Sequence, residues 1–303
     1  MRVTNQIISR SSVTRLQLNM QAMDRARDQV SSGRRINVMS DDPTAASEVV
    51  RIGSSMRAIE QFRRNIRIAE GRGAAEENIL DRLSNLVGRG MELAIQQSSS
   101  TGNAQTRLIA KAEVDQLIAA AVDLGNTKFG GEYLFGGTRS GEAPFAVPAS
   151  ASDPFSRLVD SNGDPVNPSG SISIEIADGR FIKPNHNGTE VFLDTNALQA
   201  LRDLSTALGN NDQAAVGAAL DTLQSSFDQL QTLIGTQGAR TGELIEAGDT
   251  LDSLQLSMEA FRSDLRDVEV EKAMLELVGR QTLYQAAMAA TTRVLGLSLA
   301  DYL

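Results

Sequence analysis

The chain has 303 residues, of which 41% are hydrophobic and only 4% aromatic, and it contains no Cys and no Trp. The lack of Cys excludes disulfides and Cys-ligated metals, and the formal net charge of −9 argues against a general nucleic-acid-binding protein, which needs a basic surface. So few aromatic residues are typical of long helices packed on one another rather than of one large globular core.

Charge is distributed unevenly along the chain. Residues 1–75 hold 13 Arg against 7 Asp and Glu, whereas residues 241–303 hold 5 Lys and Arg against 11 Asp and Glu. Two interpretations stay open at this point: either the two ends pair directly, or both form solvated helix faces of opposite sign.

We expect neither a membrane-spanning helix nor a cleavable signal peptide. No stretch approaches the roughly 18 apolar residues of a membrane span. The opening MRVTNQIISRSSVTRL lacks an apolar core after a basic start. If the protein leaves the cytoplasm, we expect a route that does not read a standard signal.

The first predicted element is an N-terminal helix with a coiled-coil seam. Its apolar residues recur at heptad spacing, and Arg27 interrupts the repeat. The seam residues are Val13, Leu16, Met20, Met23 and Val30. Two to three heptads are marginal for a helix alone in water, so we expect this helix to need a partner.

A polar connector is predicted over residues 33–41. Gly33 suits the end of a helix, and Asp42 followed by Pro43 is a strong helix start, because a carboxylate can cap the first turn and proline fits its first position. Two helices are predicted next, one from residue 43 to residue 68 and beyond, and one over about residues 103–124.

The middle of the chain, rich in Gly and Pro, is predicted to form a small β insert. SISIEIADGRFI (171–182) alternates apolar and polar residues, which predicts one strand, and EVFLD (190–194) predicts another. Helix is expected to return at Asn196.

Three apolar patterns follow in the C-terminal part. The first two are Leu198, Leu201, Leu204 and Leu208, and then Leu220, Leu223, Phe227, Leu230 and Ile234. After the Gly-rich run GTQGARTGE (235–243), a heptad seam continues through Leu251, Leu254, Met258, Phe261, Leu265 and Val268. The seam is displaced near residue 270 and then uses Met274, Leu277, Tyr284, Met288 and Leu295, which indicates a division between two parts of the C-terminal arm.

These patterns predict a mainly α fold with long antiparallel helical hairpins, paired terminal coiled-coil helices and a small β-rich insert domain. The first and last helices are expected to pair, because neither is stable alone. The predicted domains are a terminal coiled-coil assembly region (1–40 plus 270–303), a helical-bundle domain (41–135 plus 195–269) and the insert (136–194).

No residues form a convergent catalytic, metal-binding or cofactor-binding set, so we predict no enzyme and no cofactor. His186 is interpreted as a solvated loop residue, and Asp41 with Asp42 as helix-cap carboxylates rather than a metal or acid–base pair. The Gly-rich GEYLFGGTRSG lacks the Gly-Lys-Ser/Thr ending of a phosphate loop.

One stretch of the chain resembles the N-terminal signature of flagellins and the hook-associated proteins related to them. The matching residues are Val30, Ser31, Ser32, Gly33, Arg34, Arg35, Ile36, Asn37, Ser40, Asp41, Asp42 and Pro43. NTKFGGEYLFGGTRSG (126–141) and the C-terminal LYQAA and LSLADYL elements resemble the hook–filament junction members of this family. Met39 departs from the pattern, which usually has a small residue there.

The resemblance implies a structural subunit of the bacterial flagellum in the junction layer between hook and filament. It implies secretion through the flagellar type III export channel. The implied partners are other copies of the chain, an adjacent hook-associated protein, flagellin, an export chaperone and the export apparatus. We expect neither nucleic acid nor a membrane among the partners. A short flagellin is the alternative, and a surface adhesin that binds through the β insert is a more remote one.

In this family the matching stretch would be an elbow between the terminal helix and the hairpin. We call it the elbow motif, and its predicted assembly residues are Ser32, Gly33, Arg34, Arg35, Ile36, Asn37, Asp41, Asp42 and Pro43. Because no acidic partner is obvious nearby, we hypothesise that Arg34 and Arg35 pair with acidic side chains of an adjacent subunit. The two terminal seams are predicted to be assembly residues as well.

Overall fold

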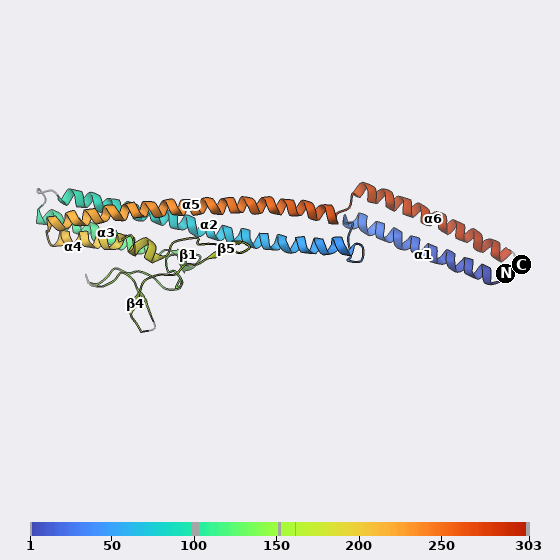
Figure 1. Cartoon of the computed structure of the whole chain (residues 1–303), viewed down its shortest axis with the longest axis horizontal. Helices are drawn as coiled ribbons and strands as arrows, with labels where there is room; N and C mark the ends of the chain where they lie inside the picture. Colours follow the sequence, from blue (N-terminus) through green and yellow to red (C-terminus); the bar gives the residue numbers. More distant parts are fainter. Residues whose placement is uncertain (1, 99–102, 151–152, 161, 301–303) are drawn as a thin grey trace. The chain divides into compact units, whose positions relative to one another are not determined.

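The computed structural model describes residues 2–98, 103–150, 153–160 and 162–300, and of these the side chains of residues 2–9, 165 and 293–300 lie outside the description. The fold is mainly α-helical with small two-stranded sheets, as predicted (Figure 1). Two compact units are present: a terminal unit, Met1–Ala58 with Asp252–Leu303, and a central unit, Ile59–Leu251. No described helix is both long enough and apolar enough to cross a membrane.

Helices make up most of the described chain. They are α1 (Arg2–Ser32), α2 (Pro43–Ser98), α3 (Ala104–Gly125), α4 (Ala197–Gly209), α5 (Gln213–Arg266) and α6 (Val270–Ala300). The predicted start at Pro43 is confirmed, since the Asp42 carboxylate accepts the Ala45 N–H at 3.0 Å. The predicted start of α3 is confirmed too, because Asn103 and Thr106 form a capping box there.

Helix α5 is longer than the sequence patterns indicate. The Gly-rich run 235–243 was expected to separate two helical segments, but α5 passes through it without a break. Each Gly costs a helix about 1 kcal/mol relative to Ala. This cost is offset by packing in the central unit, where Leu230, Gln237 and Leu244 of the same helix are fully buried.

The core of the central unit gathers side chains from α2 to α5 around a small aromatic cluster. Phe192 lies 5.2 Å from Phe135 and 5.0 Å from Phe145, measured between ring centroids. Among its fully buried aliphatic residues are Leu80, Leu83, Val87, Val114, Leu201, Leu204, Leu223 and Leu230. The few aromatic residues are therefore concentrated where the insert meets the helices.

The strands are short and pair as three antiparallel hairpins. They are β1 (Lys128–Phe129) with β2 (Glu132–Tyr133), β3 (Leu158–Val159) with β4 (Pro165–Val166), and β5 (Ile174–Ala177) with β6 (Arg180–Ile182). The segment predicted as one strand over 171–182 is thus the β5–β6 hairpin. Gly179 in its turn has a φ of +69°, a backbone conformation that suits glycine.

The strand predicted over residues 190–194 is wrong. Thr189–Leu193 forms η1, a single π-helical turn. A strand would point Val191 and Phe192 to opposite faces, but both are fully buried. The turn is also started by reciprocal bonds, because Asn187 and Glu190 each accept the other's backbone N–H through the side chain, at 2.9 and 3.1 Å.

Candidate functional site

Two connectors pair with each other inside the terminal unit. Residues 33–42 join α1 to α2, and residues 267–269 join α5 to α6. The N–H of Val268 donates to the Gly33 carbonyl at 3.0 Å, and the backbones of the two connectors also form an antiparallel bridge between Arg34 and Asp267. We call these segments the paired connectors. The division predicted near residue 270 falls at the second of them.

Backbone geometry explains why the elbow motif starts as it does. Gly33 has a φ of +67°, a backbone conformation that other residues rarely adopt, and this conformation ends α1. The Ser32 hydroxyl then accepts the Arg34 N–H at 3.2 Å. Ile36 is buried with Ala45 and Ala46 of α2, which holds the connector against the start of that helix.

The side chain of Arg35 links its own connector to the last turn of α5. Its guanidinium donates to the Leu265 carbonyl at 2.6 Å and lies 3.3 Å from the Asp42 carboxylate, while its backbone N–H donates to the Arg266 carbonyl at 2.7 Å. A cation bonded to the last carbonyls of α5 is favourable, because helix C-termini carry partial negative charge. The premise that the connector has no acidic partner nearby is therefore wrong for Arg35.

Arg34 differs from its neighbour. Within the described residues, its exposed side chain makes no hydrogen bond and no ion pair. Its charge nevertheless helps to lower the pKa of Asp267, after the larger effects of hydrogen bonds from Arg266 and Ser263. The hypothesis of a contact with another subunit therefore stays a prediction for Arg34.

The carboxylates of Asp41 and Asp42 both cap backbone groups, but at different places. Asp41 accepts the N–H groups of Asn37 and Val38, each at 3.0 Å, and so closes the connector on itself. Asp42 caps α2, as described above. Hydrogen bonds from Val38 and Asn37 hold the pKa of Asp41 below its ordinary value, and the bond from Ala45 does the same to the pKa of Asp42.

These depressed pKa values predict that the paired connectors loosen in acid. A carboxyl whose pKa is lower in the folded state contributes stability above its unfolded pKa of about 3.9 and loses it as the pH falls through the folded value. We expect hydrogen exchange of the Asn37 and Val38 amides, corrected for intrinsic rates, to accelerate below about pH 4. Asp41→Asn should weaken this pH dependence, and unchanged protection of the wild type between pH 6 and pH 3 would contradict the prediction.

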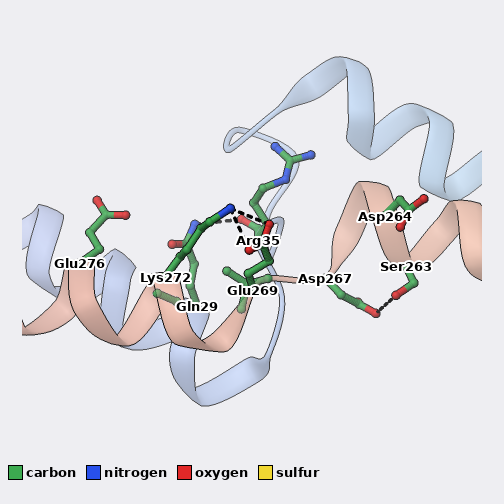
Figure 2. A pocket seen from close by; sticks show the side chains of 10 residues that line it. Gln29, Arg35, Ser263, Asp264, Asp267, Glu269, Lys272 and Glu276 are labelled. Carbon is green, nitrogen blue, oxygen red and sulfur yellow. Dashed lines mark hydrogen bonds and ion pairs between the residues drawn. The ribbon is translucent and has the colours of Figure 1, made fainter.

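A cavity of about 520 Å³ lies beside the paired connectors (Figure 2). Its lining is mostly charged and includes Asp264, Asp267, Glu269, Lys272 and Glu276. Lys272 pairs with Glu269 at 2.8 Å, and Ser263 donates to Asp267 at 2.9 Å. No group of three His, Cys, Asp or Glu suited to a metal ion occurs in the part of the chain that the structure describes. The cavity is therefore a charged surface beside the paired connectors.

Helices α1 and α6 lie side by side in the terminal unit (Figure 1). Their least exposed positions recur at heptad spacing, and Ala26 and Ala273 are the most deeply buried of them, at 3% and 4% exposure. The shielded positions are Ser12, Leu16, Asn19, Ala22, Met23, Ala26, Gln29 and Val30 on α1, and Ala273, Leu277, Arg280, Tyr284, Ala287 and Thr291 on α6.

Each predicted terminal seam has two rows of apolar side chains, one at each of the two heptad positions. Only one row of each seam lies in the contact between α1 and α6. Leu16, Met23, Val30, Leu277 and Tyr284 lie on the shielded faces. Val13, Met20, Met274 and Met288 are 47%, 49%, 54% and 47% exposed, respectively. The side chain of Leu295 lies outside the described residues. Among the described side chains, the second row of each seam is thus about half exposed in a single copy.

The interpretation of His186 as a solvated residue is wrong. His186 is 5% exposed, and its Nδ1 lies 2.7 Å from Oε1 of Glu76, which comes from α2 and is fully buried. The same carboxylate accepts the backbone N–H of His186 at 3.1 Å. Neighbouring bonds from Arg72 to Asn185 and from Gln237 to the Pro184 carbonyl also hold this loop. The Glu76–His186 pair fastens the insert to the helices.

Comparisons with known proteins agree with these features. Residues 3–140 match the bacterial flagellin N-terminal helical region. The chain is 26% identical to flagellar hook-associated protein 3 of Escherichia coli (strain K12), with 90% of each chain covered. It is 25% identical to the flagellin of Bacillus subtilis (strain 168), with 95% of this chain and 94% of that protein covered.

Solved structures share the fold. A putative flagellar hook-associated protein from Vibrio parahaemolyticus superposes with a TM-score of 0.63 at 19% identity, covering 75% of this chain and all of that one. FlgL from Bacillus cereus gives a TM-score of 0.52 at 22% identity, covering 73% of this chain and 99% of that one. With its elbow motif and its helical arms, the chain is similar over most of its length to flagellar hook-associated proteins and flagellins.

Proposed function

We propose that this chain is a structural subunit of the bacterial flagellum that forms the junction layer between hook and filament. The observation that carries the proposal is similarity over nearly the whole chain to flagellar hook-associated protein 3, of Escherichia coli and also of Salmonella typhimurium, where 99% of this chain is covered at 24% identity. The relatives are structural flagellar proteins, which supports a mechanical role rather than catalysis.

The second candidate function is that of a short flagellin. Flagellins match over a similar share of the chain, so overall similarity does not separate the two roles. The run at 126–141 and the C-terminal LSLADYL favour the junction protein. A junction protein and a short flagellin can share this fold, so an assembly experiment has to distinguish the two roles.

We propose a separate role for each of the three predicted regions of the chain. Residues 1–40 with 270–303 would form the coiled-coil assembly region, 41–135 with 195–269 the helical bundle, and 136–194 an insert away from the assembly contacts. The exposed second rows of the terminal seams, including Val13 and Met274, support further contacts with neighbouring copies, because apolar helix faces rarely remain in water. Arg34 and the rest of the elbow motif are proposed to contact an adjacent subunit.

The proposed partners are other copies, an adjacent hook-associated protein, flagellin, an export chaperone and the type III export apparatus. Secretion through the flagellar export channel is part of the same proposal. The proposal gives the β insert no role in assembly.

Self-assembly of the purified chain tests the proposal. A junction subunit needs different neighbours above and below it, so we expect no long polymers after addition of ammonium sulfate and short filament seeds. Light scattering would stay close to the level of the seeds alone, and the matched control is a flagellin under the same conditions, which should elongate them. Long polymers of this chain would favour the short flagellin instead.

A further inference from the structure

Two exposed patches of opposite charge lie on different helices of the central unit. The basic patch is formed by Arg64, Arg67 and Ile68 of α2, and the acidic patch by Ile245, Glu246 and Asp249 of α5. Each patch contains one aliphatic side chain that is 53% exposed. Within the described residues, the Arg67 and Asp249 side chains make no hydrogen bond or ion pair.

The two helices run antiparallel, and their register is defined by close approaches in the core. A β-carbon on Gly248 would lie 4.0 Å from Cγ2 of Ile66, and one on Gly90 would lie 3.7 Å from Cδ1 of Leu223. Between these points, Gln231 donates to the Ser84 hydroxyl at 2.9 Å. Residue numbers therefore rise along α2 as they fall along α5, with the same spacing of 1.5 Å per residue.

This register places the members of the two patches at matching heights along the helices. Ile68 lies level with Ile245, Arg67 with Glu246, and Arg64 with Asp249. In both patches the aliphatic residue and one charge are four residues apart, so they are neighbours on one helix face. Each cationic side chain thus has an anionic counterpart at its own level, but on the other helix of the same copy.

We propose that the basic patch of one copy binds the acidic patch of a second copy placed beside it at the same height and in the same orientation. Helix α5 of one copy then runs antiparallel to α2 of the next, so Ile68 packs on Ile245 while Arg64 and Arg67 face Asp249 and Glu246. Such a contact joins two different surfaces, so it repeats around a closed ring or along a helical layer. The inference rests on the proposed function and identifies a lateral contact for it.

Charge in this contact would determine register more than affinity. An exposed ion pair adds little affinity because water and salt screen it, whereas like charges brought together across an interface strongly disfavour the contact. A copy shifted along the axis loses the matched pairs. A copy inverted so that its other helix faces the neighbour places α2 beside α2 or α5 beside α5 and confronts like charges. A copy inverted about the line that joins the two copies keeps α2 beside α5 but reverses the order of the residues, so the three pairs no longer lie level at the same time. The patches therefore select one lateral arrangement.

Engineered cysteines test the contact cleanly, because the chain has no Cys of its own. Cells that lack the native chain would co-express an Ile68→Cys chain and an Ile245→Cys chain, and their isolated flagella would be oxidised. We expect a disulfide-linked dimer between the two chains, and a ladder of linked subunits from the Ile68→Cys/Ile245→Cys double variant. The matched control combines an Ile68→Cys chain with an Ile95→Cys chain, because Ile95 is 58% exposed on α2 but lies far along the helix from Ile68.

Charge reversal gives an independent reading with a built-in rescue. Arg64→Glu alone or Asp249→Arg alone should lower the yield of the 68–245 disulfide by about tenfold or more, because each places like charges together. The chain that carries both reversals should recover the yield. Absence of the disulfide from flagella that contain the chain at the junction would overturn the contact. A disulfide in chains found along the whole filament would keep the contact and overturn the proposed function.

Discussion

Replacing Glu76 by Ala is expected to lower the free energy of unfolding of the central unit by about 2–3 kcal/mol, because it leaves two buried hydrogen-bond donors of His186 without their acceptor. The Glu76 carboxylate is fully buried and accepts hydrogen bonds from both the ring and the backbone of His186. Its loss leaves these donors without an acceptor in a site that water does not reach, and an unmade buried hydrogen bond costs more than a made one contributes.

Native-state hydrogen exchange would measure this effect in the right part of the molecule. The amides of Val191 and Asp194, which donate to the carbonyls of Asn187 and Thr189, report on how firmly the insert is held. Glu77→Ala is the matched control, because Glu77 is the next residue on α2 but is exposed, and its loss should change stability by no more than about 0.5 kcal/mol. Equal effects of the two substitutions would show that the Glu76–His186 pair does not stabilise the insert.

The error about His186 shows what periodicity cannot reveal. A single His in a polar loop gives no sign in the sequence of the carboxylate that will meet it, since Glu76 is 110 residues away on a helix. The pair exists only because the loop crosses α2 at that level. Local patterns report helix faces and turns, but not which distant side chain comes opposite a loop.

The elements themselves follow the sequence more closely where the signal is local. The helix start at Asp42–Pro43 was predicted from capping chemistry, and capping depends on residues within one turn. The strand predicted over 190–194 failed because two adjacent apolar residues read equally well as a buried helical turn. Local preference was overridden there, as in the Gly-rich part of α5, by packing in the core.

The terminal seams were predicted from apolar heptads, but a heptad pattern does not say what each of its two rows of side chains contacts. In one copy the α1–α6 contact uses the row of Leu16 and Leu277, together with small or polar residues such as Ala26 and Ala273. Val13 and Met274 stay exposed. A seam that is wider than one partner can cover is what a chain that packs against several copies would need.

The elbow motif was identified in the sequence, but its partner was missed. Val268 and Asp267 carry no motif of their own, and their pairing with Gly33 and Arg34 is through the backbone. Backbone bonds are available to almost any residue type, so they leave no mark in composition. The one usable signal was the displaced heptad near residue 270, which marks where a second connector must interrupt the helix.

Replacing Val268 by Pro is expected to separate the paired connectors at a cost of about 3 kcal/mol in their local stability, comparable to a proline in a helix interior. Proline has no N–H, so the bond to the Gly33 carbonyl is lost, and the ring restricts Asp267 before it, where the backbone bridge lies. Hydrogen exchange at Arg35 and Ile36, whose amides donate to the Arg266 carbonyl, should accelerate by about a hundredfold, since each factor of ten corresponds to about 1.4 kcal/mol.

Val270→Pro provides a control two residues away with the same change of side chain. Val270 is the first residue of α6, where proline is well tolerated because the N–H it lacks has no partner inside the helix. We expect this variant to leave exchange at Arg35 and Ile36 unchanged and to support filaments at the wild-type level. If the paired connectors transmit force between the terminal and helical parts of the subunit, Val268→Pro chains should be exported yet yield flagella that shed their filaments under shear. Equal filament retention by both variants would mean that the elbow works without the bridge, and that α1 and α6 alone hold the subunit in place.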